Sequence, residues 1–468
     1  MKVILCTPPS KGTEACWPPI GLMYLASYLK SKSNHEIKIM DAFSCNIDEN
    51  QFLNQVKKEN PDVIGLSCTS YTFLYSMKLL EKIKKMLPDI IIVVGGIHAT
   101  FFAENILKNY KFIDFVIKGE GEITFSELIN NLHDIRKLKN IKGLAFRYKN
   151  KLINNKTELI SKLDILPFPE RELVKNNDYA HYSNGIRITS GKFTTILSSR
   201  GCPHNCIFCC CSALFNRVWR TRSVESILNE LDEIYSQGYE TCIFVDDNFS
   251  LLPERVLKIC RGIKKRKIKM GLHCEGRVDR ASFDVLKEMK EAGFSTIYYG
   301  MESGVQKVLD YYKKGTTTEQ IRNAVKNSKK IGLNTIGSFI IGSPVETRED
   351  ILKTLRFASD LRIILQINSL DIVPGSILWS ELNKDNKVGK DDWKRVYGAS
   401  KYYNNFSREE LSDLIEYGYK IQFRKWLSPT ALSDVVNLFT SQNRKIISEN
   451  SPILLIKRLA KGLRPFRE

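Results

Sequence analysis

The most informative segment of this chain is Arg200-Gly201-Cys202-Pro203-His204-Asn205-Cys206-Ile207-Phe208-Cys209. Its cysteines are spaced C-x3-C-x2-C, and an aromatic residue stands directly before the last one. Three thiolates on one tight loop can hold three irons of a [4Fe-4S] cluster and leave the fourth iron free to bind a small molecule. The alternative is a zinc knuckle or a set of buried thiols. Zinc sites usually have two separated C-x2-C pairs, and no second pair with that spacing occurs here.

The composition is that of a folded multidomain protein. The chain has 468 residues, of which 43% are hydrophobic, enough for two or three domains with sizeable cores. We recognise no N-terminal signal, because residues 1–6 run directly into a strand-like pattern, and no apolar run approaches about 18 residues. The twelve cysteines then indicate reduced thiols. We therefore expect a cytoplasmic protein without a transmembrane helix.

The net charge of +19 is spread widely along the chain, as in a lysine-rich surface. No RNA-binding motif and no dense basic block occurs, so we expect no nucleic-acid partner. The excess is sharpest near the end, where the basic segment 457–467 follows the apolar segment 453–456. This tail is predicted either to contact an anionic membrane surface peripherally or to form a partly frayed, solvated helix.

Residues 1–140 alternate between short apolar strands and helices. The strands are predicted at 2–7, 36–41, 63–68, 90–94 and 115–118, and the helices at 22–31, 50–58, 75–86 and 103–109. This alternation indicates a doubly wound, Rossmann-like parallel sheet with helices on both faces. The loops at the carboxyl ends of its strands are then expected to hold a ligand.

Residues 141–190 are predicted to form a linker. It begins with a hairpin of two strands, 143–148 and 151–155, and continues into the segment LDILPFPER at 163–171. Two prolines so close together exclude a regular helix or a central strand there.

The alternation returns in residues 191–375. Strands are predicted at 194–198, 241–245, 269–274, 296–300, 335–341 and 367–372. Six such units indicate a partial (β/α)6 barrel, whose chemistry sits at the carboxyl ends of the strands, directly where the cysteine loop follows the first strand. Residues 376–468 are predicted to be mostly helical, and Ser407-Arg408-Glu409-Glu410 forms a capping box for a helix that extends to Trp426.

The cysteine spacing and its aromatic residue resemble the signature of radical S-adenosylmethionine (SAM) enzymes, in which the open iron binds SAM. Polar groups also follow successive strands of the predicted barrel. The segments FVDDNFS, GRVDR, YYGMESG and GSPVET, beginning at residues 244, 276, 298 and 342, look like the strand-end motifs of one branch of this family. An isolated acidic residue at such a position is usually a turn or helix cap. Together, these residues indicate a SAM site.

The resemblance implies a role for each of these motifs. Asp246 or Asp247 would bind the amino group of SAM, and the choice between them stays open because the familiar Gly-Gly-Glu form is absent. Arg277 would lie near the carboxylate of SAM, and Glu302 would bind its ribose or methionyl part. The remaining contacts would be to adenine, from Phe208 and from the turn between Gly342 and Glu346.

The first domain resembles the cobalamin-binding domains of related enzymes. Ser67-Cys68-Thr69 ends one predicted strand and Gly95-Gly96 ends the next, and the resemblance implies that the nucleotide tail of the corrinoid lies between them. A structural turn is the alternative for either motif alone. Gly119-Glu120-Gly121 would donate backbone NH groups to the corrin periphery or phosphate, or would form a domain-packing turn. The familiar Asp-x-His-x-x-Gly motif is absent, and Trp17-Pro18-Pro19-Ile20-Gly21 stands in its place.

The combined resemblance implies a cobalamin-dependent radical SAM enzyme with three cofactors: a [4Fe-4S] cluster, SAM and cobalamin. Such an enzyme cleaves SAM to a 5′-deoxyadenosyl radical and, as a methyltransferase, methylates an unactivated carbon through methylcobalamin. A small-molecule substrate, lipid or porphyrin-like, and a reducing partner such as flavodoxin or ferredoxin are then expected. The alternatives are a cobalamin-using radical oxidoreductase or cyclase without methyl transfer, a tRNA methylthiotransferase, and a noncatalytic corrinoid-binding protein.

Overall fold

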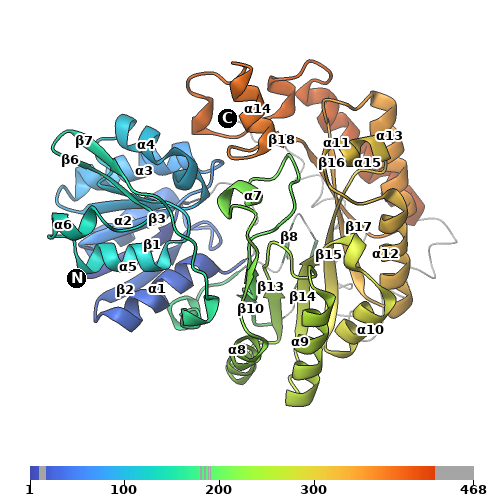
Figure 1. Ribbon diagram of the computed structural model, residues 1–468, viewed down its shortest axis with the longest axis horizontal. Helices are drawn as coiled ribbons and strands as arrows, with labels where there is room; N and C mark the ends of the chain where they lie inside the picture. Colours follow the sequence, from blue (N-terminus) through green and yellow to red (C-terminus); the bar gives the residue numbers. More distant parts are fainter. Residues whose placement is uncertain (10–16, 180–181, 184–185, 188, 190, 427–468) are drawn as a thin grey trace.

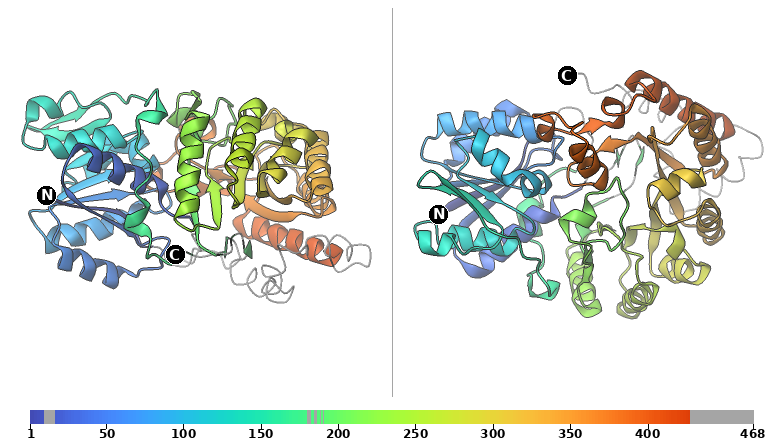
Figure 2. Two further views of the ribbon diagram at one scale, coloured as in Figure 1. Left: turned by 90° about the horizontal axis from the view of Figure 1, so that it is seen from below. Right: turned by 45° about the horizontal axis from the view of Figure 1, so that its top comes forward.

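Two α/β units lie side by side in the computed structural model, and a C-terminal segment lies across both of them (Figure 1; Figure 2, right). The structure describes residues 1–9, 17–179, 182–183, 186–187, 189 and 191–426. The predicted basic tail lies outside the described residues. No described helix is long and apolar enough to cross a membrane.

The first unit is built on a seven-stranded sheet in the order β2-β1-β3-β4-β5-β6-β7. The first five strands are parallel, and β6 and β7 are antiparallel to their neighbours. The strand bounds are β1 Lys2–Thr7, β2 Glu36–Asp41, β3 Val63–Ser67, β4 Ile91–Gly95, β5 Phe115–Ile117, β6 Leu144–Tyr148 and β7 Lys151–Asn154. The parallel strands agree with the prediction to within one residue at each end, because buried parallel strands are continuous apolar runs.

Helices cover both faces of this sheet, as the prediction of a doubly wound fold requires. One face packs against α1 (Ile20–Lys32) and α5 (Glu122–Asn130), and the other against α2 (Glu49–Glu59), α3 (Phe73–Met86) and α4 (Ile97–Asn109). A short helix, α6 (Ile135–Leu138), precedes β6. The α/β fold predicted for this part of the chain is confirmed.

The hairpin that we placed in the linker belongs instead to the first sheet. Strand β6 pairs with β5, with Val116 opposite Ala145, and β7 completes the edge. Arg147 fixes the hairpin to the unit by donating hydrogen bonds to the carbonyl oxygens of Leu107 and Lys111 at 2.7 and 2.8 Å. The sheet therefore extends beyond residue 140, where we had expected the unit to end.

The second unit is a six-stranded, fully parallel sheet in the order β10-β13-β14-β15-β16-β17, so β10 and β17 form its two edges. The strand bounds are β10 Phe193–Ile196, β13 Thr241–Phe244, β14 Gly271–Gly276, β15 Phe294–Glu302, β16 Asn334–Ile341 and β17 Ile364–Ser369. The helices on its outside are α8 Val224–Ser236, α9 Pro253–Arg266, α10 Phe283–Glu291, α11 Gln306–Tyr311, α12 Thr318–Ile331 and α13 Arg348–Asp360. This is the predicted partial barrel.

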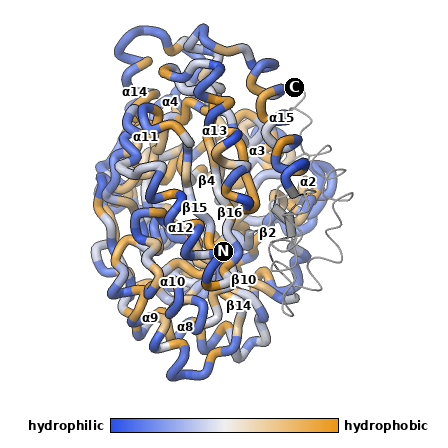
Figure 3. The backbone as a smooth tube through the Cα atoms, turned by 90° about the vertical axis from the view of Figure 1, so that its right-hand side faces the viewer, coloured by the Kyte–Doolittle hydropathy of each residue, from blue (hydrophilic) through white to orange (hydrophobic). Residues whose placement is uncertain are grey.

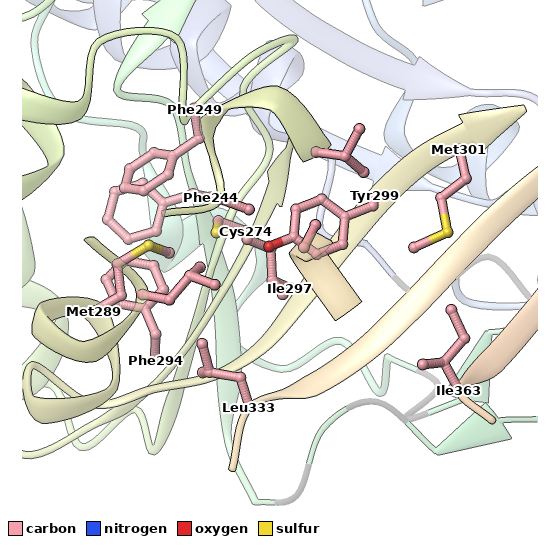
Figure 4. Packing of buried hydrophobic residues seen from close by; sticks show 14 of the residues in the cluster. Phe244, Phe249, Cys274, Met289, Phe294, Ile297, Tyr299, Met301, Leu333 and Ile363 are labelled. Atoms are coloured by element: carbon pink, nitrogen blue, oxygen red, sulfur yellow. The ribbon is translucent and has the colours of Figure 1, made fainter. Parts of the chain in front are cut away.

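A layer of buried apolar side chains joins this sheet to its helices (Figure 4). The rings of Phe244, Phe249 and Phe294 pack together with centroids 4.6 to 5.7 Å apart. Along the tube in Figure 3, the outer loops are largely hydrophilic, whereas hydrophobic segments lie mainly inside. The barrel strands are therefore stabilised by packing against the outer helices, and the side chains on the inner face are not needed for that packing.

The remaining elements lie in the linker between the units, in the loop that follows β10, and in the C-terminal segment. They are β8 Tyr182–Ser183, β9 Ile186–Arg187, β11 Ser199–Arg200, α7 Cys211–Leu214, β12 Arg220–Thr221, β18 Asp371–Ile372, α14 Ile377–Lys384, β19 Tyr397–Gly398 and α15 Arg408–Trp426. The predicted capping box begins α15: the NH of Glu410 donates to Ser407 Oγ at 3.1 Å, and the NH of Ser407 donates to Glu410 at 3.1 Å. Helix α15 covers the edge at β17, where the NH of Ile367 donates to Tyr419 Oη at 3.1 Å.

Candidate active site

The cysteine motif lies on the loop after β11, at the carboxyl end of the barrel. All three cysteines are free thiols; Cys206 is buried, and Cys202 and Cys209 are half-buried. Two backbone hydrogen bonds fix the loop, from the NH of Ile207 to the oxygen of Tyr312 at 3.1 Å and from the NH of Leu378 to the oxygen of Ile207 at 3.0 Å. The three thiols are therefore presented by a loop that both the barrel and the C-terminal segment hold.

The surroundings of these thiols suit a cationic iron cluster. Burial raises the pKa of Cys209 to about 12, so this thiol becomes a thiolate only when a metal cation compensates its charge. The amide of Asn248, which is buried, lies 3.9 Å from Cys202 Sγ. No three described His, Cys, Asp or Glu side chains surround a single ion. A cubane cluster does not require this, because each thiolate binds a different iron.

The two neighbouring carboxylates Asp246 and Asp247 have different environments. Asp246 is 1% exposed and accepts hydrogen bonds from the NH of Ser198 at 2.7 Å, from Ser199 Oγ at 2.6 Å, and from Ser198 Oγ. Asp247 is exposed and accepts a hydrogen bond from the NH of Gly201 at 2.8 Å. Asp246 therefore anchors the start of the cysteine loop, whereas Asp247 keeps oxygen atoms available for a ligand.

Four charged residues form two ion pairs beside the cysteine loop, and three of them, Arg277, Lys314 and Glu302, are buried. Arg277 pairs with Asp279 at 3.0 Å and donates to the backbone oxygen of Lys314 at 3.0 Å. Lys314 Nζ lies 2.6 Å from Glu302 Oε1. A Cβ on Gly300 would lie 2.6 Å from that same Glu302 oxygen, so the glycine leaves room for the ion pair. Glu302 itself has a φ of +63°, a strained conformation of the kind that collects at functional sites.

Lys314 was not predicted from the sequence. Its neighbour Lys313 is exposed, whereas Lys314 is 8% exposed. No feature of the sequence distinguishes two adjacent lysines in a turn, so only the fold identifies Lys314 as part of the site.

The predicted turn after β16 provides an unused acceptor. Gly342 has a φ of +87°, and the NH of Ser343 donates to Glu346 Oε2 at 2.7 Å. The other oxygen, Oε1, is buried without a partner among the described atoms. Burial raises the pKa of Glu346 to about 7. An unsatisfied buried acceptor at this position fits a ligand that donates a hydrogen bond, such as an amino group of adenine.

The strand ends of the first unit approach each other closely. Gly96 has a φ of +96°, and a Cβ there would lie 2.5 Å from the carbonyl oxygen of Cys68. The NH of Cys68 also donates to the oxygen of Gly95 at 3.0 Å. Ser67 is half-buried and Thr69 is exposed at the same edge. The glycine is thus required where β3 and β4 end, and the predicted binding residues share one edge of the sheet.

Apolar side chains remain exposed at this same edge. Trp17, Tyr71 and Ile97 follow β1, β3 and β4, and they are 39%, 67% and 39% exposed. Tyr71 also reaches β18, beyond the last strand of the barrel, where its hydroxyl donates to Asp371 Oδ2 at 2.6 Å. Exposed aromatic and aliphatic groups beside a glycine turn fit a large, flat, partly apolar ligand such as a corrin.

His98 directly follows Ile97 and is the histidine nearest the glycine turn, but its side chain is not exposed at this edge. It is fully buried, its ring stacks on Phe73 with centroids 3.9 Å apart, and its Nδ1 lies 2.9 Å from Ser70 Oγ. Burial lowers the pKa of His98 to about 3, so it remains neutral. A histidine enclosed in the core of the first unit is a packing residue and does not replace the histidine of the missing motif.

The turn from Gly119 to Gly121 is used for packing between the units. Glu120 accepts from Arg200 at 2.9 Å, from Arg220 at 2.6 Å and from the NH of Ile160 at 2.7 Å. The NH of Gly119 donates to Thr100 Oγ1 at 2.9 Å. The side chain of Glu120 and the NH of Gly119 are thus engaged within the protein. Of the two alternatives for this turn, these contacts support domain packing.

Two family models match the two units. The B12 binding domain matches residues 12–129, and the radical SAM superfamily matches residues 196–358. An uncharacterized methyltransferase of Pyrococcus horikoshii is 34% identical over 90% of this chain and 92% of its own length. The chain therefore belongs to the radical SAM superfamily, among the members that also carry a B12-binding domain.

Other relatives differ in their described activities. The anaerobic magnesium-protoporphyrin IX monomethyl ester cyclase of Rubrivivax gelatinosus is 27% identical over 77% of this chain and 66% of its own length. The structure of the cobalamin-dependent SAM radical enzyme OxsB matches 98% of this chain and 78% of that one, with a TM-score of 0.70 and 18% identity. The radical SAM methyltransferase TsrM from Kitasatospora setae matches 83% of this chain and 75% of its own, with a TM-score of 0.66 and 18% identity. The likeness to these two structures concerns the fold.

The predicted cofactors agree with this assignment. The radical SAM domain implies a [4Fe-4S] cluster and SAM, and the B12-binding domain implies cobalamin. The protein is thus a cobalamin-dependent radical SAM enzyme of the methyltransferase or cyclase type.

Proposed function

We propose that this enzyme transfers a methyl group from SAM to an unactivated carbon atom of a small molecule, with cobalamin as the methyl carrier. When bound, the cluster supplies the electron that cleaves SAM, and cobalamin supplies the methyl group. The observation that carries the proposal is the similarity to the methyltransferase of Pyrococcus horikoshii along 92% of that protein.

The residues of the barrel hold and orient the reactants in this proposal. Cys202, Cys206 and Cys209 bind three irons, and Asp247 accepts hydrogen bonds from the ammonium group of SAM. Arg277 provides positive charge beside the cluster, where the carboxylate of SAM needs it, and Lys314 neutralises Glu302. The partnerless oxygen of Glu346 accepts a hydrogen bond from adenine, beside which Phe208 lies.

The first unit positions the corrinoid. Gly95 and Gly96 allow its nucleotide tail to approach the backbone, and Ser67 and Thr69 offer hydroxyl groups to that tail. Tyr71, held by Asp371, lies beside the corrin ring. Reaction then depends on keeping the corrinoid and SAM on opposite sides of one substrate carbon, which requires a firmly held domain interface.

Radical cyclisation without methyl transfer is the second candidate, because the relatives include magnesium-protoporphyrin cyclases that are 24% to 27% identical to this chain. Either reaction needs a low-potential electron donor, for which we propose flavodoxin or ferredoxin. The two candidates differ in the products formed from SAM.

The test is anaerobic reconstitution with iron, sulfide and hydroxocobalamin, followed by mass spectrometry of the products formed from SAM with candidate substrates. Formation of both S-adenosylhomocysteine and 5′-deoxyadenosine supports methyl transfer. Formation of 5′-deoxyadenosine alone supports the cyclase or oxidoreductase. Cys202→Ala should abolish SAM cleavage and retain cobalamin, whereas Cys210→Ala, which changes a neighbouring half-buried thiol, should retain both.

A further inference from the structure

The inner face of the barrel carries an unusual row of polar side chains. Side chains alternate between the two faces of a strand, and the helix-facing positions are occupied by the buried apolar cluster, which includes Cys274 and Tyr299 (Figure 4). Their neighbours Glu275 and Tyr298 therefore point to the inside. Parallel-barrel interiors are usually filled by branched apolar residues, so polar groups at these positions need an explanation.

The strand register makes this row continuous. Glu275 on β14 is paired with Tyr298 on β15, and Ser338 on β16 is paired with Gln366 on β17. The hydroxyl of Tyr298 donates to Gln366 Oε1 at 2.6 Å, across the intervening strand. Asn368 lies two residues further along β17, on the same face as Gln366. We call Glu275, Tyr298, Ser338, Gln366 and Asn368 the polar belt.

The belt has free hydrogen-bonding capacity. Glu275 and Asn368 remain exposed although each lies on a strand within the barrel wall. Gln366 uses its oxygen for Tyr298, which leaves its amide NH2 group as a donor. Removal from bulk water inside the barrel, together with the nearby carboxylates of Asp247 and Asp246, raises the pKa of Glu275 to about 7. The nearby Lys314 is paired with Glu302. The belt is therefore rich in acceptors, and its one carboxyl group, that of Glu275, becomes negatively charged as the pH rises through about 7.

We infer that the polar belt binds the substrate, and that the substrate part held there bears hydroxyl or amino groups and carries no negative charge. This inference rests on the proposed function and deepens it. An apolar macrocycle or an acyl chain would leave Glu275, Gln366 and Asn368 unpaired in the closed site, which disfavours the lipid and porphyrin-like substrates considered above. A polyol or amino-polyol ring satisfies these groups.

The inference can be tested without knowing the substrate. The probes are glucosamine, glucose, glucuronate and cyclohexylmethanol, which compare cationic, neutral, anionic and largely apolar six-membered rings. Their binding to the holoenzyme with its cluster oxidised is measured by saturation-transfer NMR. Glucosamine and glucose should bind, and glucuronate and cyclohexylmethanol should bind at least about fivefold more weakly.

Variants locate the binding. Glu275→Gln should reduce the affinity for glucosamine about tenfold, because the loss of one hydrogen bond to a charged group lowers a binding constant by about that factor. Asn368→Ala should weaken the binding of both glucosamine and glucose. Glu319→Gln, which changes an exposed carboxylate on the outer helix α12, should change neither.

Three results of the binding measurements would overturn the inference. They are failure of both sugars to bind the holoenzyme, equal or tighter binding of cyclohexylmethanol, and unchanged sugar binding in Glu275→Gln. A tenfold loss of SAM affinity in Glu275→Gln would also overturn it, because the belt would then belong to the SAM site. The proposed function is judged separately, from methyl transfer and SAM cleavage by the unaltered enzyme, so failure of one does not imply failure of the other.

Discussion

The ion-pair group between the two units provides a sharp test of how the site is held together. Glu120 and Glu122 of the first unit pair with Arg200 at 2.9 and 2.7 Å, and Glu120 also pairs with Arg220 at 2.6 Å. The side chains of this group are at most 10% exposed. Arg200 is followed directly by Gly201 and the first cluster cysteine, so this group connects the first unit to the cluster loop.

The substitution Glu120→Gln removes one charge from this group and keeps its shape. Breaking a buried ion pair costs about 3–5 kcal/mol, because the remaining charge loses its compensation. Arg200 retains Glu122, whereas Arg220 loses the carboxylate that neutralises it, and two of its nitrogens are already buried without a described partner. We therefore expect a loss of about 3 kcal/mol, at the lower end of that range.

Urea denaturation of the reconstituted protein, followed by circular dichroism, measures this loss. With a denaturant dependence of about 2–3 kcal/mol per M, the midpoint should fall by about 1 M or more. Glu158→Gln, which changes an exposed carboxylate of the same connecting region, is the matched control and should leave the midpoint unchanged. A shift below about 0.3 M in Glu120→Gln would refute the argument that this buried charge holds the units together.

Three further changes separate ligand-binding roles from structural ones. Gly96→Ala should abolish cobalamin binding and retain iron, because its Cβ would lie 2.5 Å from a carbonyl oxygen. Gly238→Ala is the control for backbone strain, because Gly238 has a φ of +76° and open space around its Cβ position. Equal effects of the two variants on cobalamin binding would contradict the prediction. Asp247→Asn should weaken SAM binding about tenfold and leave the unfolding temperature unchanged. Asp246→Asn should lower the unfolding temperature. Isothermal titration measures the SAM affinity of each variant, and scanning calorimetry measures its unfolding temperature. Glu346→Gln should match the wild type at pH 5 and unfold at a higher temperature at pH 8, measured without SAM. Burial raises the pKa of Glu346 from 4.5 to about 7, so the stability that the protonated carboxyl provides is present below pH 4.5 and lost as the pH rises through 7. The same temperature difference at both pH values would contradict this assignment.

The strands of both sheets were predictable because their pattern has a local physical cause. A strand such as 63–67, covered on both faces by helices, must be apolar at every position and therefore stands out in the sequence. The hairpin of β6 and β7 was also predicted, but its pairing with β5 at the edge of the first sheet was not. A pattern of residues does not show which sheet edge will accept a strand, because that depends on contacts such as those of Arg147 with a distant loop.

In the candidate site too, some features were predictable from the sequence and others depended on the fold. The cysteines were predicted from their spacing, and the polar residues after the barrel strands were predicted from their places at strand ends and from the family resemblance. The fold places these residues at one end of one barrel. The different environments of Asp246 and Asp247 were not predictable, because adjacent side chains point to opposite sides and the sequence does not say which side is buried. For the same reason the exposed Lys313 and the buried Lys314 were indistinguishable.

Different physical forces hold the two units together at two places beside the site. At one place, Glu120, Arg200 and Arg220 form buried, charge-assisted hydrogen bonds whose directions fix orientation. At the other, Trp393 of the C-terminal segment packs on Phe73 of the first unit with centroids 5.4 Å apart, a contact driven by apolar burial.

The cluster loop is bound at both places, through Arg200 at its start and through Ile207, whose carbonyl oxygen accepts from Leu378 of the C-terminal segment at 3.0 Å. The proposed methyl transfer needs two cofactors on opposite sides of one carbon, and such a site tolerates errors of only about 0.5 Å in their placement. One junction alone would leave the units free to rotate about it, whereas two junctions on either side of the loop exclude that rotation. The C-terminal segment is therefore part of the catalytic framework, although no predicted cofactor ligand lies on it.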